Sequence, residues 1–69
     1  MATITDEMAT EKYRGYFINL YREQDTDNND VFYWATVHDD KGMRRDLESK
    51  MPIQSVEAAR DFIDTILGE

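Results

Sequence analysis

Residues 31–38 read VFYWATVH, and this stretch decides how the rest of the chain is interpreted. Aromatic and β-branched residues favour the pleated surface of a sheet, and no carboxylate, lysine or arginine interrupts them, so we expect a strand. Side chains alternate between the two faces of a strand. The alternation predicts one face with Val31, Tyr33, Ala35 and Val37 and another with Phe32, Trp34, Thr36 and His38. Neither face is clearly polar.

The segment before it repeats this composition. Residues 12–22, KYRGYFINLYR, predict another strand, because tyrosine, phenylalanine and isoleucine suit a sheet better than a helix. Alternation here predicts Tyr13, Phe17 and Tyr21 on one face, and Tyr16, Ile18 and Leu20 on the other. Residues 23–30, EQDTDNND, predict the loop that joins the two strands, since Asp and Asn satisfy their own backbone in turns.

The residues after this strand predict a turn, a third strand and a helix. Residues 39–42, DDKG, are typical of a hairpin connection, and residues 43–48 predict a third strand whose charges suit a sheet edge. From Ser55 the period changes to that of a helix, with Ser55 as N-cap, Glu57 in the first turn and Gly68 as the stop. The helix is expected to bury Val56, Ala59, Phe62, Ile63, Ile66 and Leu67.

The sequence therefore predicts an α+β fold, in which a three-stranded antiparallel meander carries one C-terminal helix on one face (β-β-β-α). Residues 12–69 are expected to form a single domain, and residues 1–11 a flexible N-terminal tail or a short helical turn after Thr5. A chain of 69 residues has a thin core, and without cysteine it has no disulfide to support that core. Efficient packing or self-association is the remaining source of stability.

Charge and hydropathy bear on location and partners. Fifteen acidic residues against eight basic ones give a net charge of −7, which disfavours nucleic acid and anionic membranes as partners. The first dozen residues, MATITDEMATEK, resemble neither a secretory signal nor a transit peptide, and no stretch approaches the length of a membrane span. We expect a cytoplasmic protein.

Two patterns contain residue types found in chemical sites, but neither is complete. Asp25-x-Asp27-x-Asn29 resembles the start of a calcium loop, but the sixth position is Asp30 where a glycine is needed, and the twelfth is Thr36 where a glutamate is needed. The single histidine, His38, stands beside two aspartates and is the one candidate for a catalytic base. A thin core leaves little room for a pocket, so we expect no enzyme, metal or cofactor.

An RNA-binding module is the alternative interpretation. Aromatic side chains stack on bases while cations hold phosphate, and the available cations are Lys12, Arg14, Lys41, Arg44 and Arg45. The β-β-β-α order resembles, in topology alone, double-stranded-RNA-binding domains and small antitoxin-type domains. Those RNA-binding domains begin the final helix with a lysine-rich turn, whereas residues 55–58 read SVEA and would repel a phosphate.

The leading hypothesis is a non-enzymatic domain that acts by protein contact, through a homodimer or another protein partner. One helix shelters one face of a sheet, and the aromatic residues outnumber the places beneath it. The predicted contact residues are Tyr13, Phe17, Tyr21 and Trp34. Whether Trp34 or Tyr33 faces outward depends on the strand register. The competing explanation is that the N-terminal segment and the acidic loop cover this face.

Overall fold

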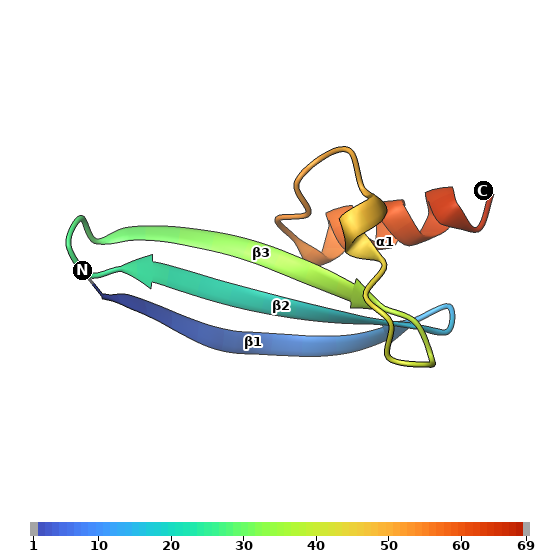
Figure 1. Ribbon diagram of the computed structural model, residues 1–69, viewed down its shortest axis with the longest axis horizontal. Helices are drawn as coiled ribbons and strands as arrows, with labels where there is room; N and C mark the ends of the chain where they lie inside the picture. Colours follow the sequence, from blue (N-terminus) through green and yellow to red (C-terminus); the bar gives the residue numbers. More distant parts are fainter. Residues whose placement is uncertain (1, 69) are drawn as a thin grey trace.

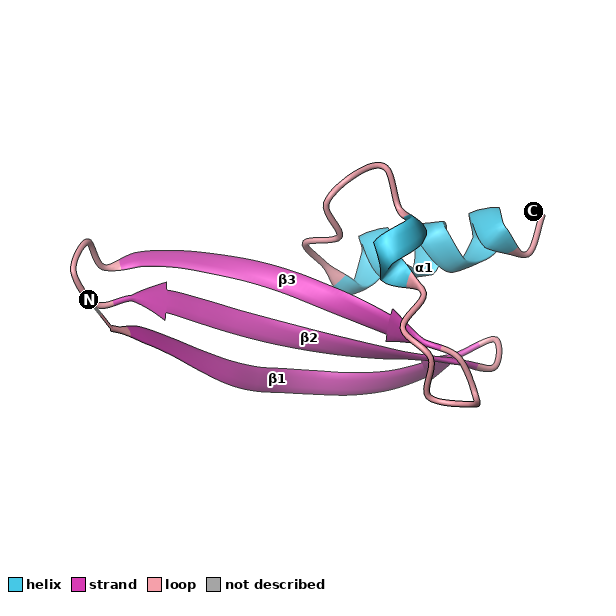
Figure 2. Ribbon diagram, viewed as in Figure 1, coloured by secondary structure: helices cyan, strands magenta, loops and turns pink. Residues whose placement is uncertain are grey.

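The computed structural model describes residues 2–68. Over that range the chain forms one antiparallel sheet in the order β1-β2-β3, followed by two helical segments (Figures 1 and 2). The elements are β1 (Thr3–Tyr13), β2 (Tyr16–Asp25), β3 (Asp30–His38), the 3₁₀ helix η1 (Asp46–Glu48) and the helix α1 (Val56–Ile66). The predicted fold class, a three-stranded antiparallel meander followed by one C-terminal helix, is confirmed.

The molecule is elongated because the strands are longer than the helix. Its principal extents are 41 × 21 × 17 Å. An 11-residue helix spans about 16 Å, whereas a strand of similar length spans about 35 Å. Figure 1 shows α1 lying over the end of the sheet that carries the β1–β2 turn. The half of the sheet near the β2–β3 turn therefore extends beyond the helix.

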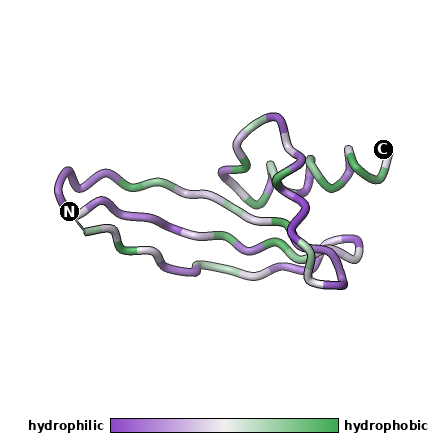
Figure 3. The backbone as a smooth tube through the Cα atoms, viewed as in Figure 1, coloured by the Kyte–Doolittle hydropathy of each residue, from purple (hydrophilic) through white to green (hydrophobic). Residues whose placement is uncertain are grey.

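The core lies between α1 and this covered end of the sheet. Ser55 begins the helix by accepting a hydrogen bond from the Ala58 amide on its side-chain oxygen, and apolar residues then recur along one side (Figure 3). The buried apolar residues are Ile18, Ala35, Val37, Ile53, Ala59 and Ile63. The predicted helix face is thus correct at Ala59 and Ile63, while Leu67 is exposed.

The segment predicted as a first strand over 12–22 is in fact a hairpin. Arg14 and Gly15 both have positive φ, 51° and 87°, and form a two-residue turn between Tyr13 and Tyr16. Arginine rarely adopts a positive φ, so it gives no turn signal, and the sequence predicted one continuous strand here. The turn sends the chain back on itself and places Tyr13 beside Tyr16, on the helix-covered face.

The expectation of a flexible tail or short helical turn over 1–11 was wrong for the described part, because Thr3–Tyr13 form the edge strand β1. Side chains from Thr3 to Thr10 are all exposed, so the strand has no buried face and no apolar alternation to reveal it. Its pairing with β2 comes from the backbone, with a bulge between Glu7 and Ala9.

The predicted third strand over 43–48 was also wrong. A single bridge joins His38 to Arg44, and Asp46–Glu48 form η1. The carboxylate of Asp46 accepts a hydrogen bond from the Val37 amide at 3.2 Å, so a side chain takes the place of a strand at this part of the β3 edge. The turn predicted over 39–42 is present, with Gly42 at φ 84°.

Candidate functional site

Four aromatic side chains share the sheet face that α1 does not cover. The register pairs Tyr21 with Trp34, and alternation puts Phe17 and Phe32 on the same side. The Tyr21 and Trp34 rings stack with centroids 4.4 Å apart and planes 20° apart. Phe17 is 36% exposed and Phe32 53% exposed. We call these four residues, Phe17, Tyr21, Phe32 and Trp34, the aromatic face.

The aromatic face is cationic at one end and anionic at the other. Beside Phe17, near the β1–β2 turn, the Lys12 ammonium lies 5.9 Å from the ring centroid. Glu7 stands beside Tyr21, and Glu23 stands beside Phe32 towards the far end. Phe17 and Glu23 are six residues apart on one strand, which is about 20 Å. The face therefore has a direction along the strands.

Arg44 lies at the same end of the face, within an ion pair. Its guanidinium binds the Asp46 carboxylate through Nε and Nη2, at 2.8 and 2.9 Å. The hydrogen bond to Asp46, followed by that carboxylate's charge and a smaller influence of Tyr21, raises the pKa of Arg44 against the effect of burial. Arg44 is therefore held in place beside the stacked pair, and its charge is balanced by Asp46.

The structure separates Tyr13 from the other predicted contact residues. The Tyr13 hydroxyl donates to Asp64 of α1 at 2.9 Å, and the Arg60 guanidinium lies 6.0 Å from its ring centroid. The hydrogen bond to Asp64, and then burial, raise the pKa of Tyr13. Tyr13 therefore lies beneath α1. The prediction that it shares a face with Phe17 and Tyr21 was wrong, because the turn at 14–15 reverses the chain.

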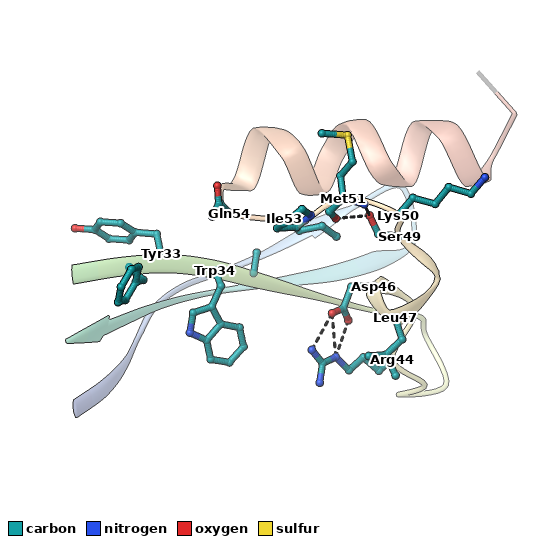
Figure 4. Close-up of a pocket in the computed structure, with 13 residues that line it drawn as sticks. Tyr33, Trp34, Arg44, Asp46, Leu47, Ser49, Lys50, Met51, Ile53 and Gln54 are labelled. Carbon is teal, nitrogen blue, oxygen red and sulfur yellow. Dashed lines mark hydrogen bonds and ion pairs between the residues drawn. The ribbon is translucent and has the colours of Figure 1, made fainter. Parts of the chain in front are cut away.

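The register also settles which of two neighbouring rings shares that face. Trp34 lies with Tyr21 and Phe17, whereas Tyr33 points to the helix side of the sheet. Figure 4 shows the two side chains leaving β3 in opposite directions. Tyr33 is nevertheless 47% exposed, because it lies beyond the reach of α1.

The cations named for an RNA site are mostly paired within the chain. Arg14 binds Asp64 at 2.8 Å, Arg45 binds Glu48 at 3.1 Å, and Arg44 binds Asp46 as described. Each guanidinium thus carries a neighbouring carboxylate that would repel a phosphate. Of the set, Lys12, Arg14, Lys41 and Arg44 are exposed, whereas Arg45 is half-buried.

The residues considered for catalysis or metal binding lie apart. His38 ends β3, with its Nδ1 buried and unpartnered among residues 2–68. In the β2–β3 turn, Asp25 accepts a hydrogen bond from the Asp27 amide at 2.9 Å, which is ordinary turn geometry. Within the described residues no group of three or more His, Cys, Asp or Glu is placed to hold a metal ion.

A second feature, which the sequence did not reveal, is the outer edge of β3. The Ala35 amide donates to the Ile53 carbonyl at 2.9 Å, and the Val37 carbonyl accepts from the Arg45 amide at 2.7 Å. Odd-numbered residues of β3 thus point their backbone groups away from β2. By that alternation Val31 and Tyr33 do the same, but within residues 2–68 nothing pairs with them. The one sequence feature that pointed to this edge was the uninterrupted apolar strand predicted over residues 31–38.

A groove of about 560 Å³ lies along this edge. Its walls are residues 32–35 of β3 and residues 49–54 of the loop before α1, with the Arg44–Asp46 pair at one end (Figure 4). Met51 in the loop is 76% exposed. The unpaired edge therefore continues into an apolar recess.

No helix in residues 2–68 has the length and apolar character needed to cross a membrane. Comparison of the chain with models of known families, with curated proteins and with solved structures finds no match. The arguments for function therefore come from the surfaces just described.

Proposed function

We propose that this protein is a small acidic protein-binding domain without catalytic activity, and that it acts by self-association through the aromatic face. The observation that carries the proposal is the stacked Tyr21–Trp34 pair, flanked by exposed Phe17 and Phe32, on the face of the sheet opposite α1. Aromatic residues are enriched at the centres of protein interfaces, where they combine large area with little conformational entropy.

The charges on this face favour a second copy as the partner. If two copies pack face to face with their strands antiparallel, β1 of one copy lies over β1 of the other, and Lys12 of one copy comes close to Glu7 of its partner. Each copy then supplies both a positive and a negative charge to the interface, as two-fold symmetry requires. Sheets that pack in this way lie about 10 Å apart and interdigitate their side chains.

The proposal includes a cytoplasmic location. A chain without cysteine forms no disulfide, as is usual for proteins of a reducing compartment, and its stability must come from packing and association. The paired arginines favour protein over RNA as the partner, since each already has a carboxylate beside it.

Sedimentation equilibrium over a wide concentration range tests self-association. We expect a reversible dimer that Phe17→Ser and Trp34→Ser shift towards monomer. Tyr33→Ser is the matched control, because it removes a similarly exposed ring from the other face and should leave the dimer intact. A protein that stays monomeric at every concentration would contradict the proposal. So would a dimer that neither serine variant weakens.

Charge exchange tests the antiparallel arrangement. Lys12→Glu should weaken the dimer by placing like charges together, and adding Glu7→Lys in the same chain should restore it. If the double variant is weaker than either single variant, the copies do not pack in this direction. Tight binding of single-stranded RNA by the unmodified protein at low salt would instead favour the RNA alternative.

A further inference from the structure

We propose that the outer edge of β3 at Val31 and Tyr33 binds an extended, basic segment of a partner protein, which adds to the sheet as a fourth strand. This surface adjoins the aromatic face and shares Phe32 and Trp34 with it, but it binds through the backbone edge and the groove beside that edge. Strand addition of this kind takes its affinity from main-chain hydrogen bonds and its specificity from pockets for alternate side chains.

The outer edge of β3 is open at two residues of the described chain. Val31 and Tyr33 each direct an amide and a carbonyl outward, and within the described residues these groups have no partner. Next to them, the Ala35 amide donates to Ile53, the Val37 amide donates to Asp46, and the Val37 carbonyl accepts from Arg45. The loop before α1 therefore closes one part of the edge and leaves the adjacent part open.

The other edge of the sheet, β1, is better protected against strand addition. β1 has a bulge between Glu7 and Ala9 and two pairs of charged side chains, at 6–7 and 11–12, and both features hinder addition of a strand. Residues 31–34 of β3 have neither a bulge nor a charge, and their side chains are valine and three aromatics. Of the two edges, β3 is the one without these protections.

The charges at the ends of the open edge favour a basic occupant. The open edge leads to the β2–β3 turn, where Asp25, Asp27 and Asp30 cluster. At its other end Lys50 lines the groove, and Arg44 is neutralised by Asp46. An extended segment lying here would place part of its length beside three carboxylates, so lysine or arginine residues are favoured there. Apolar side chains between them would enter the groove.

A second copy fits this edge poorly, for geometric and electrostatic reasons. In an antiparallel pairing with Val31 opposite Tyr33 of the other copy, residue 29 would fall opposite Ala35, where Ile53 already pairs. The acidic turns of both copies would also approach the same edge, and each chain carries a net charge of −7. The occupant is therefore an unfolded or extended stretch of another protein.

The test uses a blocked eight-residue peptide that alternates valine with lysine. Trp34 is the chain's single tryptophan and lines the groove, so its fluorescence should report binding. Amide hydrogen exchange by NMR should show new protection at Val31 and Tyr33. Binding should weaken by at least about tenfold when the peptide amides on one edge are N-methylated, because hydrogen bonds are lost. The matched peptide with glutamate for lysine should also bind more weakly.

A backbone variant gives the matched control. Val31→Pro removes one outward amide while leaving the pairing of β2 with β3, because proline is tolerated at the open side of an edge strand. It should abolish peptide binding, whereas Val31→Thr keeps the amide and should bind. Circular dichroism of both variants verifies the fold. Phe17→Ser should bind the peptide normally, so the edge and the self-association are tested separately.

Three results would overturn the proposal. The first is failure of the lysine peptide to bind, and the second is equal binding of its N-methylated form. The third is protection of the Val31 and Tyr33 amides that rises with protein concentration in the absence of peptide, which would assign the edge to a second copy.

Discussion

Asp46 shows how one side chain replaces part of a strand. Its carboxylate is 8% exposed, and it accepts from the Val37 amide and from Arg44. Burial acts to raise the pKa of Asp46, but the hydrogen bonds from Arg44 and from the Val37 amide outweigh it, and the pKa falls below the ordinary 3.8. A depressed pKa in the folded state means that the ionised form stabilises the fold.

We therefore expect Asp46→Asn to lower the free energy of unfolding by about 1–3 kcal/mol at pH 7, where the contribution of the carboxylate is complete. The contribution is present above pH 3.8 and disappears as the pH falls through the lower pKa of the folded state. Urea unfolding of both proteins across this range measures the difference, which should shrink under acid. Asp40→Asn, in the exposed turn, is the control. A difference independent of pH would show that charge is not the cause.

Ile63 is the residue of α1 on which the core depends most. It is fully buried against the sheet, whereas Phe62 beside it is only partly buried. Ile63→Ala should cost about 2–5 kcal/mol, a large part of the stability of so small a domain. Phe62→Ala should cost less, although phenylalanine is larger, because burial decides the loss. Thermal unfolding of both variants tests the order, and a reversed order would mean that Phe62 packs more deeply.

At the scale of the elements, the hairpin between β1 and β2 depends on Gly15. Its φ is 87°, and no atom lies within 4 Å of where a Cβ would be, so an alanine would meet conformational strain and no clash. Gly15→Ala should therefore lower the free energy of unfolding by about 1–2 kcal/mol. Gly15→Asn should lose less, because asparagine tolerates positive φ. Chemical denaturation measures both variants. Equal losses would show that the space around the turn, and not the positive φ, causes the loss of stability.

The same hairpin explains which elements the sequence predicted and which it did not. The helix was predicted to within a residue or two, because Ser55, the apolar period and Gly68 are strong local signals. The turn at Arg14 and Gly15 was missed, since arginine at positive φ has no such signal. β1 was missed as well, because an exposed edge strand is held by backbone pairing and shows no apolar alternation.

The candidate site was predictable in part for the same reasons. Alternation correctly grouped Phe17 with Tyr21, because both stand on one uninterrupted strand. It failed for Tyr13, on the other side of the missed turn, and it left Trp34 undecided until the register was known. The open part of the β3 edge depends on how residues 44–53 fold back over the strand, which the local sequence does not encode.

At the scale of the whole molecule, the two halves of the sheet differ in how many tertiary interactions stabilise them. All six buried apolar residues of the described chain belong to the end under α1. Ion pairs from β1 and the β1–β2 turn to the helix, Glu11 with Arg60 and Arg14 with Asp64, also lie at that end. The other half of the sheet is joined mainly by its own backbone hydrogen bonds, so it should open locally at a lower free energy than the rest.

Hydrogen exchange of the monomer, measured by NMR on Phe17→Ser at low concentration, tests this asymmetry. Amides of Ile18 and Ile63 should exchange only with global unfolding, whereas inward amides of β2 and β3 near Asp25 and Asp30 should exchange at least about tenfold faster. Association of the unmodified protein should slow the second group, because the proposed interface spans the aromatic face along the strands. Uniform protection in the dilute monomer would contradict a two-part sheet, and unchanged exchange on association would place the interface elsewhere.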